Sequence, residues 1–251
     1  MRMGLQVSAD RGRYATKVEK LQDDARWADE AGLDTVWTPQ IPDEFDVMTA
    51  ATLLGAATSR IEVGTSVVPI QPRHPIVLAQ QALSTQAVCG GRFTLGLGVS
   101  HHWIIEDMLG LQYERQATTM RCYLDVLDQA LAGPGLVEVD NELFHIRNPL
   151  DVTDIAPTTV MMAALGPVML KLAGERADRR RHSRSERPGS LCRRLDLVAA
   201  FSERDDAAVV VGDPGVGKAP QPLLHGGLAA ADEDVADAAC VAVLHQTRVV
   251  R

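Results

Sequence analysis

The sequence predicts an α/β protein of the (β/α)8-barrel type, with about five βα units and an irregular C-terminal tail. Between residues 4 and 178, short β-branched runs alternate with longer amphipathic segments, which is typical of a parallel sheet covered by helices. Residues 61–103 contain strand, helix and strand in succession, which is the βαβ unit. The length of the helices favours a closed barrel over an open sheet. In such folds the chemistry collects just past the carboxyl ends of the strands, here residues 65–68 and 98–103.

The elements are predicted from local periodicity and from glycine and proline punctuation. Strands are expected at residues 4–8, 33–38, 61–68, 92–99 and 159–165. Helices are expected at residues 15–31, 45–58, 76–89, 114–131 and 168–176. Residues 137–146 alternate in polarity around Asp140-Asn141, which predicts a hairpin inserted between barrel units.

The chain changes character near residue 178. The first 178 residues carry a formal charge of −9 and the remainder +1, which gives the −8 of the whole chain. We therefore predict a barrel portion at 1–178 and a partly disordered tail at 179–251, derived from a shifted reading frame or a gene fusion. Within the tail we expect a helix at 192–201 and a strand at 207–211.

Composition excludes several classes of function. The acidic balance argues against nucleic-acid and anionic-membrane partners, which favour a basic surface. The four cysteines form no CxxC pair, which indicates reduced thiols and no zinc site. The N-terminus lacks the apolar core of a signal peptide, and no apolar stretch approaches the roughly 20 residues of a membrane span. We expect a soluble, cytoplasmic protein.

Two short motifs at predicted strand ends can be interpreted either as packing features or as parts of a cofactor site. The run from Thr65 through Ser66 and Val67 is either barrel packing or a wall against a flat cofactor, and spacing alone favours packing. Gly96 and Gly98 form Gly-Leu-Gly without the third glycine of a dinucleotide fingerprint. We expect these two glycines to allow close backbone approach at a crowded strand end.

The loop from Ser100 to Trp103 contains two adjacent histidines, His101 and His102. Histidine suits proton transfer near neutral pH, and the alternative is a surface loop with two solvated imidazoles. No nearby carboxylate or thiol completes a metal site. Gly166-Pro167 marks a strand-to-helix junction, and the free backbone N–H groups of the helix N-terminus there can hold a phosphate, although every barrel unit has such a junction.

The tail contains a segment from Gly212 to Lys218 that fits the phosphate-binding pattern GxxxxGK. The next residue is Ala219, where magnesium binding needs Ser or Thr. Pro220 and Pro222 obstruct the helix that should follow. A nucleotide-binding module is therefore the weaker alternative.

Five motifs together resemble the luciferase-like monooxygenase superfamily, in particular its coenzyme F420-dependent oxidoreductases. They are Ala31-Gly-Leu-Asp-Thr-Val-Trp37, Ala57-Thr-Ser-Arg-Ile-Glu-Val-Gly-Thr-Ser-Val-Val-Pro69, Arg73-His-Pro-Ile-Val-Leu-Ala-Gln-Gln81, Gly90-Gly-Arg-Phe-Thr-Leu-Gly-Leu-Gly-Val-Ser-His101 and Ala163-Ala-Leu-Gly-Pro167. The resemblance covers residues 1–178. It implies a barrel that binds F420, or FMN in other branches, at the carboxyl ends of its strands.

The resemblance also implies roles for particular residues. Ser66-Val67 matches a non-prolyl cis peptide that backs the deazaflavin ring, and Leu165 and Gly166 match the cradle of the cofactor phosphate. His101 stands where some relatives carry a catalytic acid. We expect four further residues at the strand ends to contact the cofactor: Gln40, Thr65, Gly98 and Ser100. Gln40-Ile41 stands where sugar-phosphate dehydrogenase relatives have an acidic–histidine pair, which disfavours that substrate class.

The predicted function is hydride transfer between a small organic substrate and a deazaflavin, with no metal. A barrel stopped after five units leaves exposed strand edges, so we expect impaired activity and possible homo-oligomers. Two alternatives remain: a non-catalytic remnant without cofactor, and an FMN-dependent monooxygenase.

Overall fold

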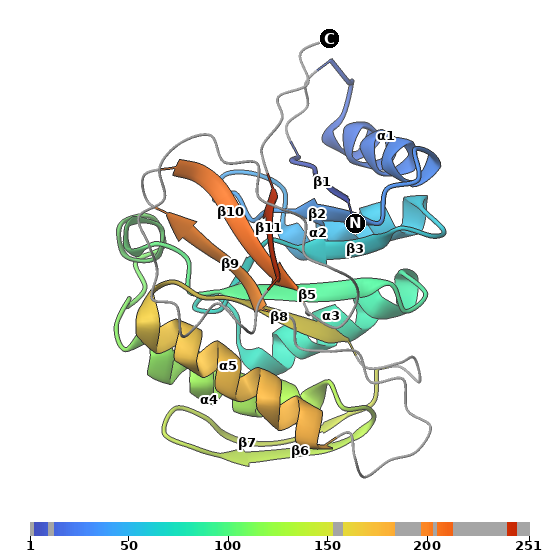
Figure 1. The fold of residues 1–251 in the computed structure, drawn as a ribbon. Helices are drawn as coiled ribbons and strands as arrows, with labels where there is room; N and C mark the ends of the chain where they lie inside the picture. Colours follow the sequence, from blue (N-terminus) through green and yellow to red (C-terminus); the bar gives the residue numbers. More distant parts are fainter. Residues whose placement is uncertain are drawn as a thin grey trace.

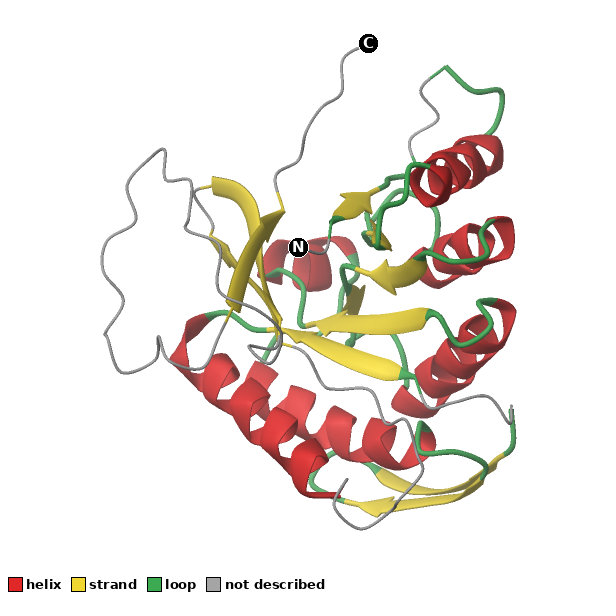
Figure 2. Cartoon of the chain, turned by 45° about the vertical axis from the view of Figure 1, so that its right-hand side comes forward, coloured by secondary structure: helices red, strands yellow, loops and turns green. Residues whose placement is uncertain are grey.

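The computed structural model describes residues 3–9, 13–152, 158–183, 197–202, 205–212 and 240–244, with side chains described as far as Arg176. Figure 1 shows a curved sheet whose strands are crossed on the outside by helices, and Figure 2 shows the helices following the arc of the sheet. The architecture is the α/β arrangement predicted from the alternating sequence pattern.

The elements follow the chain in an almost strict alternation. The strands are β1 (Gly4–Gln6), β2 (Thr35–Thr38), β3 (Glu62–Thr65), β4 (Val68–Pro69), β5 (Phe93–Gly98), β6 (Gly135–Asp140), β7 (His145–Leu150), β8 (Thr159–Ala163), β9 (Leu197–Ser202), β10 (Asp205–Gly212) and β11 (Cys240–Leu244). The helices are α1 (Lys17–Glu30), α2 (Val47–Ala57), α3 (Pro75–Val88), α4 (Gln116–Ala130) and α5 (Gly166–Ser183), with a π-helical turn at Trp103–Met108.

The main sheet has the strand order β1-β2-β3-β5-β8-β9-β10-β11, and the short β4 also pairs with β5. All pairings from β1 to β9 are parallel, whereas β10 is antiparallel to both β9 and β11. The predicted insertion is confirmed as the antiparallel hairpin β6–β7. It lies beside α4 at the lower edge of Figure 1.

Local capping explains where the helices begin. Thr16 and Glu19 form a reciprocal capping box at α1, so that helix starts one residue after Thr16. The Asp46 carboxylate accepts hydrogen bonds from the backbone N–H groups of Met48 and Thr49 at the start of α2. Pro75 occupies the first turn of α3, where its missing N–H costs nothing.

The two faces of the sheet differ in burial because alternate residues point to opposite sides. One face belongs to the same core cluster as the helices and is fully buried at Val36, Val63, Leu95, Leu97, Val160 and Met162. The other face is half-buried at Thr35, Trp37, Thr94 and Thr159. The hydrophobic core therefore sits between the sheet and its outer helices.

The strand β9 lies where the sequence predicted the end of a helix. Residues 197–201 form the strand β9, whereas the sequence predicted a helix over 192–201; residues 192–196 lie outside the described residues. Leu197 and Val198 pair with Met162 and Ala163 at the open edge of β8, so edge pairing decided the conformation where local periodicity suggested a helix. The strand predicted at 207–211 is confirmed within β10.

The predicted boundary at residue 178 falls inside α5, which continues to Ser183 where the sequence predicted an end at Arg176. The succession β8, α5, β9 is one more strand–helix–strand unit with parallel strands, so the alternation of strands and helices continues beyond that boundary. The division into two portions stays a prediction. Gly212 ends β10, and the rest of the GxxxxGK segment lies outside the described residues.

Candidate cofactor site at the carboxyl ends of the strands

The centre of the candidate site is the segment that separates β3 from β4. The peptide bond between Ser66 and Val67 is cis, as the resemblance implied. The Ser66 N–H donates to the carbonyl of Thr38 at 2.9 Å, which ties the segment to the end of β2. Thr65 is fully buried, and its hydroxyl is already used in contacts with Gly96 of β5.

Two glycines of β5 make room for this segment. A Cβ atom at Gly96 would lie 1.9 Å from the Thr65 carbonyl oxygen, and one at Gly98 would lie 2.6 Å from Cγ2 of Val67. Real Cβ atoms do not approach other atoms so closely. The Gly-Leu-Gly pattern thus serves close packing at a strand end, as the sequence predicted.

Two buried polar atoms at this end of the sheet have no hydrogen-bond partner among the described residues: Ser66 Oγ and Gln71 Oε1. The Gln71 side chain is anchored from its other end, because Nε2 donates to the Val99 carbonyl at 2.7 Å. A buried polar group without a partner is costly, and a bound molecule is one way to satisfy it. Sequence reasoning missed Gln71, since no motif marks it.

These features fit a flat heteroaromatic cofactor. The edge of such a ring carries donor and acceptor groups, which would satisfy Ser66 Oγ and Gln71 Oε1. The third orphaned atom, Thr158 Oγ1, lies just before β8 begins, at the opposite end of that strand from Leu165.

The loop after β5 carries the two histidines. The His102 imidazole Nε2 lies 3.0 Å from Glu106 Oε2. The His101 ring stacks on Trp103, with centroids 6.3 Å apart and planes inclined by 18°. Among the described side chains His101 has no hydrogen-bond partner, so the two histidines are chemically distinct. The loop expected after β5 contains the π-helical turn Trp103–Met108, which includes Glu106.

Gln40 is held by its own polar network at the end of β2. Its Oε1 accepts hydrogen bonds from the Val47 N–H at 3.2 Å and from Arg73 at 3.4 Å. Arg73 also forms an ion pair with Asp46. Burial raises the pKa of Asp46, but hydrogen bonds from Arg73 and Thr49 outweigh it and hold that pKa below its ordinary value. The cofactor contact expected for Gln40 stays a prediction.

Leu165 and Gly166 form the turn from β8 into α5. Gly166 has a positive φ of 76°, which favours glycine there. The Leu165 side chain is 55% exposed. Ser100, on the neighbouring strand end, also has a positive φ, of 59°. The predicted residues that follow β3, β5 and β8 therefore lie at the same end of the sheet, because the carboxyl ends of parallel strands are on the same side.

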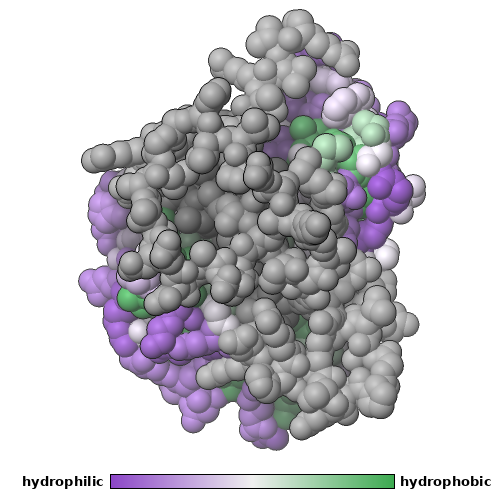
Figure 3. Space-filling model, in the orientation of Figure 1, coloured by the Kyte–Doolittle hydropathy of each residue, from purple (hydrophilic) through white to green (hydrophobic). Residues whose placement is uncertain are grey.

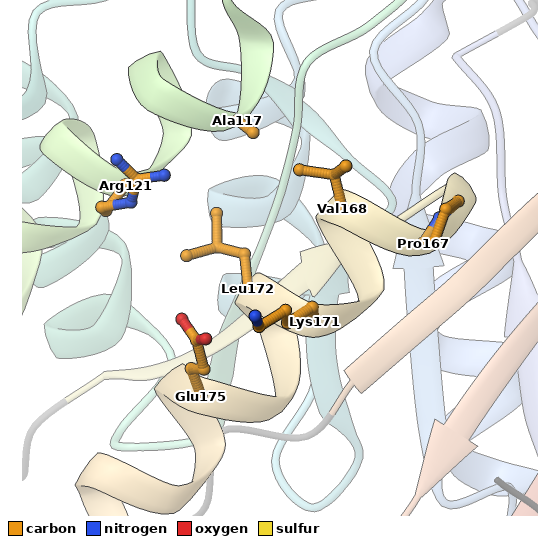
Figure 4. Close-up of a pocket in the computed structure, with 7 residues that line it drawn as sticks. All are labelled: Ala117, Arg121, Pro167, Val168, Lys171, Leu172 and Glu175. Atoms are coloured by element: carbon orange, nitrogen blue, oxygen red, sulfur yellow. The ribbon is translucent and has the colours of Figure 1, made fainter.

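A groove of about 430 Å³ lies between α4 and α5 (Figure 4). It is lined by Ala117, Arg121, Pro167, Val168, Lys171, Leu172 and Glu175. The lining combines aliphatic side chains with charges of both signs, and it includes none of the predicted catalytic or cofactor-contacting residues. Pro167 and Val168 do link it to the turn at Gly166.

The described surface in Figure 3 is largely hydrophilic, with smaller hydrophobic patches. Several large apolar side chains are exposed near the strand ends, among them Ile41, Trp103, Met108 and Leu165. Within the described residues no cluster of three or more His, Cys, Asp or Glu side chains could hold a metal ion. None of the described helices is long and apolar enough to cross a membrane. The described thiols, Cys89 and Cys122, are buried and unpaired.

Several curated proteins resemble this chain in sequence. A protein from Mycobacterium tuberculosis, provisionally named a coenzyme F420-dependent oxidoreductase, is 31% identical over 60% of this chain and 47% of its own length. The 5,10-methylenetetrahydromethanopterin reductase of Methanolobus tindarius is 30% identical over 64% of this chain and 49% of its own. The chain thus spans about half the length of these curated relatives.

Among solved structures, the coenzyme F420-dependent tetrahydromethanopterin reductase of Methanopyrus kandleri superposes with a TM-score of 0.60 at 26% identity. This match covers 69% of the chain and 53% of that structure. The model of the luciferase-like monooxygenase family matches residues 1–241, further than the expected limit at residue 178. The chain therefore belongs to the luciferase-like monooxygenase family.

Proposed function

We propose that this chain binds coenzyme F420 at the carboxyl ends of its strands and acts as an oxidoreductase on a small organic substrate. The observation that carries the proposal is a pair of buried atoms with no hydrogen-bond partner among the described residues, Ser66 Oγ and Gln71 Oε1. The names of the relatives support this choice of cofactor, because two of them are F420-dependent by name.

Each predicted residue has a place in this proposal. Ser66 and Val67 support the ring of the cofactor, with Thr65 and Gly98 shaping the strand ends behind them. Leu165 and Gly166 present backbone groups to its phosphate, and Gln40 and Ser100 border it. Gln71 adds a polar contact that the sequence did not indicate.

The deazaflavin, when bound, supplies the hydride chemistry, and the protein supplies orientation and electrostatics. His101 holds or accepts the proton that accompanies the transfer, because its imidazole has no hydrogen-bond partner among the described side chains. His102 is less suited to this role, since Glu106 occupies its Nε2. The exposed Trp103 and Leu165 side chains border the site and favour a substrate with an apolar part.

A specific observation keeps FMN as the second candidate. The 4-hydroxyprotoasukamycin monooxygenase of Streptomyces nodosus is 30% identical over 60% of this chain. The FMN-bound Baeyer–Villiger monooxygenase component from Pseudomonas putida has the same fold, with a TM-score of 0.58. An FMN-dependent monooxygenase would place the same strand ends around a related ring.

The test is a fluorescence titration of the purified chain with F420, with FMN run in parallel. Saturable binding of F420 alone supports the proposal, and binding of FMN alone supports the monooxygenase. Binding of neither would favour a non-catalytic protein. Impaired turnover, a homo-oligomeric state and a cytoplasmic location stay predictions, checked by steady-state kinetics, light scattering and cell fractionation.

A further inference from the structure

The loop after β5 contains a backbone conformation that needs support. Ser100 has a φ of 59°, in the left-handed region that side chains other than Gly, Asn and Asp rarely adopt. His101 follows immediately, so the direction in which its side chain leaves the backbone depends on the conformation of Ser100. Something in the surroundings must hold the peptide group between these two residues.

Tyr113 supplies that support from the far end of the same loop. Its hydroxyl donates a hydrogen bond to the Ser100 carbonyl oxygen at 2.9 Å. The side chain is half-buried, and burial raises the pKa of its phenol, so the hydroxyl is a proton donor throughout the neutral range. The bond therefore fixes the carbonyl that immediately precedes His101.

Two further contacts hold Tyr113 in place. Its backbone N–H donates to Glu106 Oε1 at 3.2 Å, and the other oxygen of Glu106 meets His102 Nε2 at 3.0 Å. The His102 ring also stands edge-on to the Tyr113 ring, with centroids 6.3 Å apart. The carboxylate of Glu106 thus joins both ends of the loop.

The other side of His101 is equally constrained. Its carbonyl oxygen accepts hydrogen bonds from the N–H groups of Ile104 and Ile105, at 3.1 and 3.0 Å. Ile105 is fully buried, so this turn is anchored in the core. Backbone contacts on both sides leave His101 stacked on Trp103, with its imidazole otherwise free among the described side chains.

We propose that Tyr113 is a positioning residue for His101, because its hydroxyl locks the Ser100 carbonyl and so keeps the His101 imidazole stacked on Trp103. Glu106, which also accepts from the Tyr113 N–H, contacts the imidazole of His102 and leaves that of His101 without a hydrogen-bond partner among the described side chains. The two histidines therefore differ in their hydrogen bonding. The catalytic meaning of this arrangement rests on the proposed function. The orientation of His101 does not, so it can be measured without cofactor.

The test observes the histidine rings directly by NMR in protein labelled with ¹³C and ¹⁵N histidine. The chain has seven histidines, and the variants His101→Gln and His102→Gln assign the two signals of interest. Tyr113→Phe removes the hydroxyl and keeps the ring. We expect the His101 ring protons to lose the upfield shift caused by Trp103 and to move toward the values of an unstacked imidazole.

Tyr123→Phe is the matched control. The Tyr123 hydroxyl also donates to a backbone carbonyl, that of Arg73 at 3.0 Å, but outside the loop. This variant should leave the His101 signal in place. Replacing Tyr113 with p-aminophenylalanine restores an N–H donor at the same point and should restore the wild-type shift.

An unchanged His101 signal in Tyr113→Phe would overturn the proposal. So would an equal change in Tyr123→Phe, or a change spread over all the histidines, because either would show a general structural effect. Failure of F420 binding would remove the proposed function and leave the result on His101 unaffected.

Discussion

The hydroxyl of Thr65 donates to the carbonyl of Gly96 at 3.0 Å and accepts from its N–H at 2.9 Å. Regular pairing between β3 and β5 ends at Gly64 and Thr94, so a side chain continues the hydrogen bonding where the backbones separate. This contact brings the Thr65 backbone against Gly96 and fixes the start of the Ser66-Val67 segment.

Gly96→Ala should therefore be strongly destabilising. The added Cβ would lie 1.9 Å from the Thr65 carbonyl oxygen, a rigid backbone atom that cannot turn aside. We expect a loss of about 3 kcal/mol in the free energy of unfolding, measured by urea titration. Gly174→Ala is the control, because no atom lies within 4 Å of its Cβ position in α5. That variant should gain about 0.5–1 kcal/mol, and equal losses in both would contradict the packing argument.

Ser66→Ala should weaken cofactor binding and increase the stability of the cofactor-free protein against unfolding. Its buried hydroxyl has no partner among the described residues, so its removal relieves an unsatisfied polar group in the absence of ligand. If the cofactor satisfies that hydroxyl, affinity for F420 should fall about fivefold to tenfold. Fluorescence titration and thermal unfolding measure the two effects.

Thr158→Val is the control for Ser66→Ala, because it removes another orphaned hydroxyl at the opposite end of the sheet. It should stabilise the protein and leave F420 affinity unchanged. A parallel loss of affinity in both variants would place the cofactor elsewhere.

Arg176→Gln should weaken the packing of α5 against α4 and so destabilise the fold. The guanidinium is 5% exposed, and it bonds Asp125 at 2.6 Å, Asp128 at 3.3 Å and the Arg121 carbonyl at 3.0 Å. We expect a loss of about 1–3 kcal/mol in the free energy of unfolding. Arg26→Gln, which breaks a half-exposed pair with Asp23, should change stability by no more than about 0.5 kcal/mol. Similar losses in the two variants would show that burial of the Arg176 ion pairs does not increase their contribution to stability.

Asp29 should make stability depend on pH. Burial raises its pKa, but hydrogen bonds from the N–H groups of Ser59, Arg60 and Ile61, with the nearby Arg60 charge, outweigh burial and hold the pKa below its ordinary value. A depressed carboxyl pKa stabilises the fold above the ordinary value of 3.8, and this contribution is lost as pH falls through the folded pKa.

Asp29→Asn should therefore cost about 1–3 kcal/mol at pH 7. The difference from wild type should shrink below about pH 4, as measured by urea unfolding at both pH values. Asp23→Asn, at a half-exposed carboxylate, serves as the control. A difference for Asp29→Asn that is the same at both pH values would exclude its charge as the cause.

The sequence by itself determined the alternating strands and helices and the inserted hairpin, and it indicated the strand ends at which we propose the site. These features depend on local periodicity and on the rule that parallel strands end on one side. The packing role of Gly96 and Gly98 could also be predicted, because glycines in a strand mark close backbone approach. The family motifs correctly located the cis peptide at Ser66-Val67.

Only the tertiary structure decided which atoms near those strand ends have no hydrogen-bond partner among the described residues. Hydrogen bonds such as Tyr113 to Ser100 and Gln71 to Val99 join residues whose sequence neighbours give no sign of the contact. The same reason explains the strand β9, which formed because β8 offered an unpaired edge. The contact between Glu106 and His102 likewise required the structure, since a loop sequence does not fix which imidazole a carboxylate meets.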